Sequence, residues 1–344
     1  MKKIRIGVLC PSEIAFRRFM PALSGLKDFT YVGVAIANKW EWFGRPTEAL
    51  LTAERKKADQ FRQTYGGTVF ASYRELLESP KVDAVYLPLP PGLHYRWGKE
   101  VLKADKHLLM EKPFTTSLQN TRELLALAGQ KELAVHENYM FVYHSQLDYI
   151  REWITGGALG EMRLIRIDFG FPFRGTSDFR YNRALGGGAL LDCGGYTLKL
   201  ATLLLGETAE ITASQLNTKD GLEVDIYGSA TLTNAAGLTA QVSFGMDNSY
   251  RCSLDVWGSA GHLYANRILT APDGFEPTVV ISQGDEERVV TLPADDTFRK
   301  SIEHFGKCVI NAEMRENNRQ AIDKQSQLVE KIGGWADESD RARD

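Results

Sequence analysis

The sequence predicts a protein of two domains, an N-terminal α/β domain on a parallel sheet followed by an α+β domain rich in antiparallel strands. Three observations lead to this fold class. The chain has 344 residues, which is enough for two domains. Apolar strands alternate with helices up to about residue 140. After that point successive strands follow one another through short turns, the pattern of an antiparallel sheet.

The first part of the chain repeats a strand-then-helix unit. We expect right-handed crossovers between parallel strands, since helices separate the apolar runs. Strands are predicted at residues 4–9, 31–37, 82–87, 107–110 and 134–136, and helices at residues 16–26, 47–65, 72–78, 94–102 and 117–129.

The second part contains mostly strands. They are predicted at residues 163–171, 210–217, 223–233, 238–244, 249–257 and 261–265, with a hairpin at 279–281 and 288–292. Helices are predicted at residues 146–155, 190–205, 298–311 and 319–332. The expected domains are residues 1–140 and 141–336, and a charged, disordered tail covers residues 337–344.

Composition excludes several classes of protein. Charged residues make up 25% of the chain and the net charge is −3, so no basic surface for nucleic acid or an anionic membrane is indicated. No apolar run is long enough to span a bilayer. The four cysteines are scattered, without the spacing of a disulfide framework or a metal site. We therefore expect a cytoplasmic protein without a bound metal.

The turn after the first strand has the layout of a dinucleotide-binding site. Strand, tight turn and helix succeed one another, which places a pyrophosphate at the helix N-terminus. The predicted cofactor-binding residues here are Cys10, Pro11, Ser12, Glu13 and Ile14. Cysteine and serine replace the usual glycines of this turn, so the Cβ of Cys10 would displace the pyrophosphate or force a turn that is not αL. An ordinary strand-to-helix turn is the alternative interpretation.

The end of the second strand bears on the choice of cofactor. A site for NAD usually places an acidic residue there to hold the ribose 2′-hydroxyl. Instead, Asn38 and Lys39 follow the strand, with Arg45 nearby. Lys39 or Arg45 could bind a 2′-phosphate, which favours NADP over NAD. Both could equally be charges on a surface loop, so NAD stays possible.

The stretch Glu111-Lys112-Pro113 ends an apolar strand in charged residues. Ligands bind at the carboxyl ends of strands in a parallel sheet, so we predict that Lys112 acts on a substrate. A solvated lysine before the next helix is the alternative interpretation. A second unusual stretch, residues 186–196, has three glycines followed by Leu-Leu-Asp-Cys-Gly-Gly-Tyr.

Together these stretches resemble the Gfo/Idh/MocA family of nicotinamide-dependent oxidoreductases, and the similarity covers nearly the whole chain. The resemblance implies a Rossmann domain and an α+β domain whose large, open sheet commonly mediates homodimers or homotetramers. It also implies catalytic roles for Lys112, Asp192 and Tyr196. The further cofactor-binding positions are Pro88, Leu89, Pro90, His94, Glu111, Lys112, Asn138 and Arg180. As a lone histidine, His94 is also interpreted as structural.

The chemistry implied is hydride transfer between nicotinamide and a sugar carbon. Tyr196 would donate a proton, since a phenol stays protonated at neutral pH. An ammonium such as Lys112 would lower the tyrosine pKa and stabilise a developing alkoxide. Asp192 precedes Tyr196 by four residues, on the same face of a helix, and could hold Lys112 or a sugar hydroxyl.

Three functions remain open. The leading hypothesis is reduction of a 3-keto deoxysugar carried on a nucleotide, because Asp178-Phe179-Arg180 resembles that branch of the family. The second is dehydrogenation of a free sugar, polyol or aromatic dihydrodiol. The third is a sensor without catalysis, which the unusual turn at Cys10 motivates.

Overall fold

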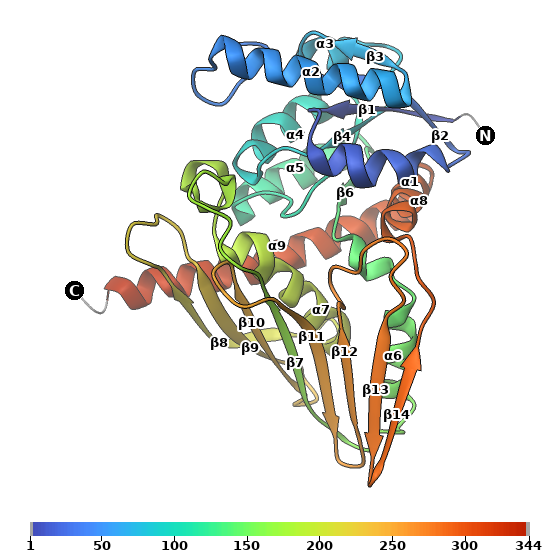
Figure 1. The fold of residues 1–344 in the computed structure, drawn as a ribbon, viewed down its shortest axis with the longest axis vertical. Helices are drawn as coiled ribbons and strands as arrows, with labels where there is room; N and C mark the ends of the chain where they lie inside the picture. The colour runs from blue at the N-terminus through green and yellow to red at the C-terminus, as the bar shows by residue number, and fades with distance from the viewer. Residues whose placement is uncertain (1–2, 342–344) are drawn as a thin grey trace. The chain divides into compact units, whose positions relative to one another are not determined.

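The computed structural model describes residues 3–341, and the side chains of residues 3–334. The chain divides into two compact units (Figure 1). One holds the chain up to Asn138 together with Phe298–Asp323, and the other holds Tyr139–Thr297 and the chain from Lys324. The expected boundary after residue 140 lies beside the first crossing, but the return of Phe298–Asp323 to the first unit was not anticipated.

The first unit is built on a parallel sheet with the strand order β3-β2-β1-β4-β5-β6, which confirms the predicted fold class. All five neighbouring pairs are parallel. The strands are β1 (Ile4–Leu9), β2 (Phe29–Ala35), β3 (Thr68–Phe70), β4 (Ala84–Leu87), β5 (His107–Met110) and β6 (Val135–Glu137). Only β3 was absent from the sequence prediction, because three residues carry too little periodicity to be detected.

The helices of the first unit begin where capping residues predict. Thr47, Ser72 and Ser117 each accept a hydrogen bond from the backbone N–H three residues further on. The helical segments are η1 (Ala15–Phe19), α1 (Met20–Ser24), α2 (Glu48–Tyr65), α3 (Tyr73–Glu78), η2 (Pro91–Leu93), α4 (His94–Lys103), α5 (Leu118–Gln130) and α8 (Thr297–Ile310).

The second unit carries an eight-stranded sheet with the order β14-β13-β12-β11-β7-β10-β9-β8. The strands are β7 (Met162–Gly170), β8 (Glu210–Asn217), β9 (Tyr227–Thr233), β10 (Thr239–Gly245), β11 (Arg251–Gly258), β12 (His262–Asn266), β13 (Thr278–Gln283) and β14 (Glu286–Thr291). All pairs are antiparallel except β7 and β10, which are parallel. A long connection through a helix separates those two strands, as parallel pairing requires.

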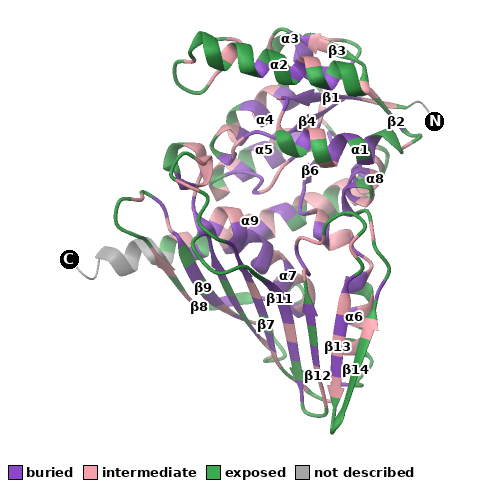
Figure 2. Ribbon diagram, viewed as in Figure 1, coloured by how far each residue is buried: buried purple, intermediate pink, exposed green. Residues whose placement is uncertain are grey.

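Alternation along the strands places one face of this sheet in the core. Figure 2 shows the strands striped in buried and exposed residues. On β11, for example, Leu254 and Val256 are buried while Trp257 is exposed. The buried face packs against helix α7 (Gly195–Leu205), which contacts β7 and β10. The unit also contains η3 (Met140–Tyr143), α6 (Gln146–Thr155), η4 (Phe179–Tyr181), η5 (Arg183–Leu185) and η6 (Leu190–Gly194).

The last helix, α9 (Ala312–Arg341), begins in the first unit and continues into the second. It places residues 337–341 of the expected tail in a helix, and residues 342–344 lie outside the described residues. In the described part of the chain, no helix combines the length and the apolar character needed to cross a membrane.

Candidate active site

The turn after β1 has a positive φ at Cys10, although it lacks the glycines that usually occupy such turns. Cys10 has a φ of 118°, which is positive but lies outside the αL region. The Ser12 hydroxyl accepts a hydrogen bond from the Ala15 N–H at 3.2 Å, and the Ser12 carbonyl accepts from Phe16 N–H at 3.0 Å. Ser12 therefore caps the helix that begins here, while the side chain of Ile14 is exposed.

The Cys10 side chain is directed toward the α2 helix. Its Sγ lies 3.7 Å from Oε1 of Glu54, which is almost fully buried. Burial, reinforced by the Glu54 carboxylate, raises the pKa of the Cys10 thiol well above its ordinary value. The thiol therefore stays protonated and unreactive at neutral pH.

The segment after β2 leaves Lys39 available to a ligand. Lys39 is exposed, and its Nζ lies 4.8 Å from the ring centroid of Trp40. The nearest carboxylate along the chain, Glu41, is buried and accepts hydrogen bonds from the backbone N–H groups of Asn38, Tyr73 and Arg74. Because Glu41 caps α3, it does not offer the free carboxylate that an NAD ribose would need.

Lys112 is the second residue after β5, at the carboxyl end of the sheet, where the sequence predicted it. The preceding Glu111 carboxylate accepts hydrogen bonds from Tyr86 Oη at 2.6 Å and from Asn138 Nδ2 at 2.7 Å. Burial raises the pKa of Glu111, while those two donors and the Lys112 charge oppose the shift. Glu111 thus accepts bonds from residues at the ends of two neighbouring strands.

His94 joins the two loops at this edge of the sheet. It is fully buried, and its ring nitrogens lie 2.8 Å from the Pro113 carbonyl and 2.7 Å from the Leu89 carbonyl. Burial lowers its pKa to about 4, so the ring is neutral at pH 7. A neutral ring donates to only one of the two carbonyls, so His94 bonds one loop and packs against the other, between the Pro88–Pro90 loop and the loop that carries Lys112.

In the second unit, Asp192 forms an ion pair with Arg180. Arg180 Nε lies 2.8 Å from Asp192 Oδ2, and Arg180 Nη1 lies 3.1 Å from Asp178 Oδ1. All three side chains are less than a quarter exposed. The structure thus brings together two predicted site residues, Arg180 and Asp192, and adds Asp178 as the second partner of the guanidinium.

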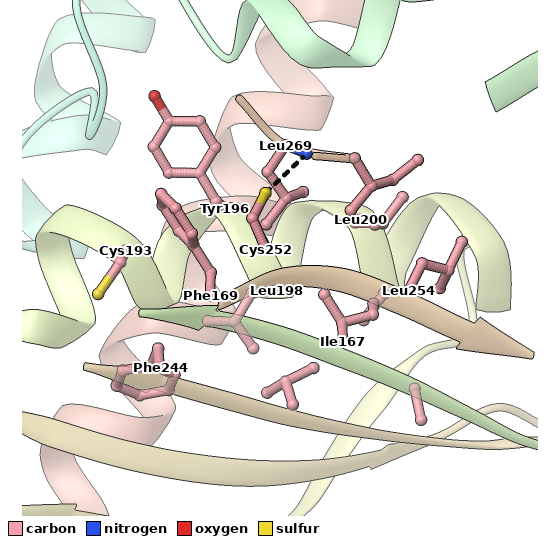
Figure 3. Close-up of a cluster of buried hydrophobic side chains, with 14 of the residues drawn as sticks. Ile167, Phe169, Cys193, Tyr196, Leu198, Leu200, Phe244, Cys252, Leu254 and Leu269 are labelled. Carbon is pink, nitrogen blue, oxygen red and sulfur yellow. Dashed lines mark hydrogen bonds between the residues drawn. The ribbon is translucent and has the colours of Figure 1, made fainter. Parts of the chain in front are cut away.

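Tyr196 stands at the start of α7, in an aromatic cluster. Its ring centroid lies 5.1 Å from that of Tyr139, 5.4 Å from Phe169 and 5.7 Å from Phe141. Figure 3 shows the ring beside Phe169, with the phenolic oxygen directed away from the sheet. The aromatic contacts hold the ring on several sides and leave its polar end turned away from the packed core.

The helix that carries Asp192 and Tyr196 is widened at its start. Residues Leu190–Gly194 form a π-helical segment that leads into α7, so Asp192 lies in a widened turn rather than in a regular α-helix. Such widened turns occur frequently at functional sites. Gly195 follows it, where a Cβ would lie 2.1 Å from the Tyr139 hydroxyl oxygen. Only glycine lets Tyr139 pack there.

Asp225 anchors the start of this helix, and sequence reasoning missed it. Its Oδ2 accepts a hydrogen bond from Leu190 N–H at 2.6 Å, and its backbone carbonyl accepts from Ala189 N–H at 2.8 Å. At Gly188, where φ is 124°, a Cβ would lie 2.3 Å from Asp225 Oδ1. The triple glycine thus allows the backbone to approach this carboxylate. Residues 223–226 were predicted as strand, which concealed the capping role.

The structure places the predicted residues in two groups. Lys112, Glu111, His94 and Asn138 belong to the first unit, whereas Arg180, Asp192 and Tyr196 belong to the second. The catalytic pairing of Lys112 with Tyr196 stays a prediction. No cluster of histidine, cysteine, aspartate or glutamate that could hold a metal ion occurs among the residues that the structure describes.

Comparisons with known proteins identify the class. Residues 31–139 match the model of an oxidoreductase family with an NAD-binding Rossmann fold, and residues 147–264 match the GFO/IDH/MocA C-terminal domain. The chain belongs to the Gfo/Idh/MocA oxidoreductase family, which confirms the resemblance seen in the sequence.

Individual relatives and solved structures show which members of the family the chain is similar to. A dTDP-3,4-didehydro-2,6-dideoxy-alpha-D-glucose 3-reductase of Actinomadura kijaniata is 36% identical over 96% of this chain and 94% of its own length. The enzyme of the same name from Saccharopolyspora spinosa is 34% identical, over 96% of this chain and 97% of its own length. Among solved structures, the 3-ketoreductase KijD10 of Actinomadura kijaniata, in complex with NADP and TDP-benzene, matches with a TM-score of 0.88. It is 34% identical and covers 97% of this chain and 98% of its own.

Proposed function

We propose that this chain is an NADP-dependent oxidoreductase that reduces the 3-keto group of a dTDP-linked deoxysugar. The observation that carries the proposal is the similarity to enzymes with this activity over almost the whole of both chains. Variants of the Actinomadura kijaniata enzyme with a substituted lysine and a substituted tyrosine have also been solved. Those two residues are 84 positions apart, as are Lys112 and Tyr196.

The residues of this chain suit the cofactor. The backbone at Cys10 has the positive φ that glycine usually provides, so the turn after β1 can keep the backbone path of a dinucleotide-binding turn. The exposed Lys39 would bind the 2′-phosphate, because the carboxylate nearest to it along the chain, Glu41, is occupied by backbone N–H groups. When bound, NADPH supplies the hydride that reduces the carbonyl carbon.

The remaining chemistry falls to side chains. Tyr196 would donate its phenolic proton to the carbonyl oxygen as the alkoxide develops. The Lys112 ammonium would stabilise the negative charge on that oxygen. Asp192 would act through Arg180, to which it is bonded, and so fix the polar side of the helix that carries Tyr196.

The test uses purified protein, NADPH and the 3-keto sugar nucleotide, with cofactor oxidation followed by absorbance. The reverse reaction, from the 3-hydroxy sugar nucleotide and NADP, gives a second assay. We expect turnover in both directions. For Tyr196→Phe we expect kcat to fall by about 100-fold or more, the contribution of a general acid, with little change in NADPH affinity. An unchanged kcat would remove Tyr196 from the proposed role.

A second candidate function is dehydrogenation of a free sugar or a dihydrodiol. It is favoured by a D-xylose 1-dehydrogenase (NADP(+)) of Haloferax volcanii, 30% identical over 74% of this chain and 78% of its own length. A substrate panel of free sugars, polyols and dihydrodiols beside the sugar nucleotide separates the two. Failure to bind NADPH or NADH at millimolar concentration would favour the sensor hypothesis instead.

We also propose a homo-oligomer formed through the outer face of the eight-stranded sheet. That face exposes Tyr227, Trp257, Tyr264 and Val289, each more than a third exposed. Strand register places Tyr264 beside Val280, and Val280 beside Val289, so apolar side chains form a row across three strands. Exposed apolar rows of this kind are typical of protein interfaces. The four free cysteines are consistent with work in the reducing cytoplasm.

A further inference from the structure

A chain of buried polar side chains leads from α8 to the loop of Lys112. Ser301 Oγ lies 2.7 Å from Asn138 Oδ1, and Asn138 Nδ2 lies 2.7 Å from Glu111 Oε1. On the other side, Ser301 Oγ lies 2.9 Å from His136 Nε2. Every member belongs to the first unit, although α8 is distant in sequence from the strands that it joins.

The direction of each bond is determined by its neighbours. The single proton of the Ser301 hydroxyl is donated to Asn138 Oδ1. The Ser301 oxygen must then accept from His136, which fixes the proton of that ring on Nε2. With Oδ1 held by Ser301, the Asn138 amide presents its NH₂ to Glu111, where Tyr86 also donates.

Burial leaves these hydrogen-bonded side chains few other partners. Ser301 is fully buried, and His136 and Asn138 are each 1% exposed. Water cannot readily replace a lost partner at such positions, so removal of the Ser301 hydroxyl would leave a donor and an acceptor without a bond. The amide of Asn138 would then be free to rotate away from Glu111.

We infer that Ser301 and His136 are positioning residues for the reaction, which hold Asn138 against Glu111 so that this carboxylate keeps its charge and its place beside Lys112. The inference rests on the proposed function, because that function gives Lys112 its role. It describes an orienting device rather than a proton relay. The Asn138 amide lies in the middle of the chain and does not pass a proton from one side to the other.

The pKa of Glu111 depends on the groups around it, so the loss of the Asn138 hydrogen bond can be detected as a change in that pKa. Tyr86 faces it from β4, and Lys112 follows it at the end of β5. Burial already raises the pKa of Glu111, and the bonds from Tyr86 and Asn138 restrain that rise. Loss of the Asn138 bond should therefore raise the pKa further. As the pH is lowered, the activity of such a variant should therefore begin to fall at a higher pH than that of the unmodified protein.

The decisive comparison is Ser301→Ala against Ser301→Thr, which keeps a hydroxyl, and Thr121→Val. Thr121 carries a fully buried hydroxyl of the same unit, which bonds the Thr115 hydroxyl. We expect Ser301→Ala to lower kcat about tenfold with KM and NADPH affinity within about twofold, and to shift the acid side of the pH profile upward. Ser301→Thr should restore the profile, and Thr121→Val should not move it.

A second readout does not need turnover. The Glu111 carboxyl is titrated by ¹³C NMR in protein without substrate, and Glu111→Gln identifies its signal. A midpoint in Ser301→Ala equal to that of the unmodified protein would overturn the inference, as would an equal shift in Thr121→Val. Should Ser301→Ala fail to fold, His136→Phe removes only the outer donor and is expected to shift the midpoint in the same direction. If no 3-keto sugar nucleotide is reduced, the proposed function fails, while the NMR titration still tests the positioning.

Discussion

Single side chains in this protein act largely through the backbone groups that they hold. Glu41 accepts hydrogen bonds from three backbone N–H groups, two of them at the start of α3. Lys39 stays exposed two residues before it. We therefore expect the choice between the two dinucleotides to depend on the charge of Lys39, and substitution of that charge tests the expectation.

For Lys39→Ala we expect the dissociation constant of NADPH to rise about tenfold and that of NADH to stay within about twofold. A charge-assisted bond to the 2′-phosphate is lost only with the phosphorylated cofactor. Fluorescence titration of both cofactors measures the difference. Lys56→Ala, another exposed lysine of this unit, serves as control. Equal weakening of NADPH and NADH in Lys39→Ala would contradict the assignment.

The carboxyl group of Asp225 should make stability depend on pH. Burial raises its pKa to about 6 from an ordinary value of about 4. Between these values the folded protein keeps a proton that the unfolded chain has released, so the free energy of unfolding falls as pH rises through this window. Asp225→Asn removes that dependence. Calorimetry from about pH 4 to 7 should show the difference in Tm between the two proteins changing with pH, and a constant difference would count against it.

At the scale of elements, the segment from Gly186 to α7 shows how glycines position a helix. Gly188 lets the backbone approach Asp225, and Gly195 lets the helix approach Tyr139. Between them lies the widened turn with Asp192. The placement of Tyr196 therefore depends on close backbone contacts at both ends of the turn, which any Cβ would disturb.

Gly195→Ala should destabilise the protein by about 1–3 kcal/mol, because its Cβ would overlap the Tyr139 hydroxyl. Denaturant unfolding measures the loss. Adding Tyr139→Phe removes the overlapping oxygen and should recover part of it. Gly25→Ala is a suitable control, since the nearest atom to its Cβ would be 3.8 Å away. If the double variant is no more stable than Gly195→Ala, the overlap is not the cause.

At the scale of the whole molecule, the chain passes between its two units more than once. The segment Phe298–Asp323 returns to the first unit and brings Ser301 with it. The other large feature at this scale is the outer face of the eight-stranded sheet, where exposed aromatic side chains form the proposed interface between copies.

Trp257→Glu combined with Tyr264→Glu should shift the oligomer toward monomer, since two charges would be buried at the interface. Size-exclusion chromatography with light scattering measures the mass in solution. Ile310→Glu, at an exposed apolar position of the first unit, is the control and should leave the mass unchanged. A monomeric unmodified protein, or an oligomer that survives the double substitution, would rule out this face.

The sequence by itself determined the order of elements, the parallel and antiparallel sheets, the family and the placement of Lys112 at a strand end. These follow from local periodicity, capping residues and short motifs, which need no knowledge of distant contacts. Tertiary structure decided the rest: the parallel pairing of β7 with β10, the bond of Arg180 to Asp192, and the roles of Asp225 and Ser301. These contacts join residues that are between 12 and 163 positions apart, through hydrogen bonds and pairings that leave no periodic signal in sequence.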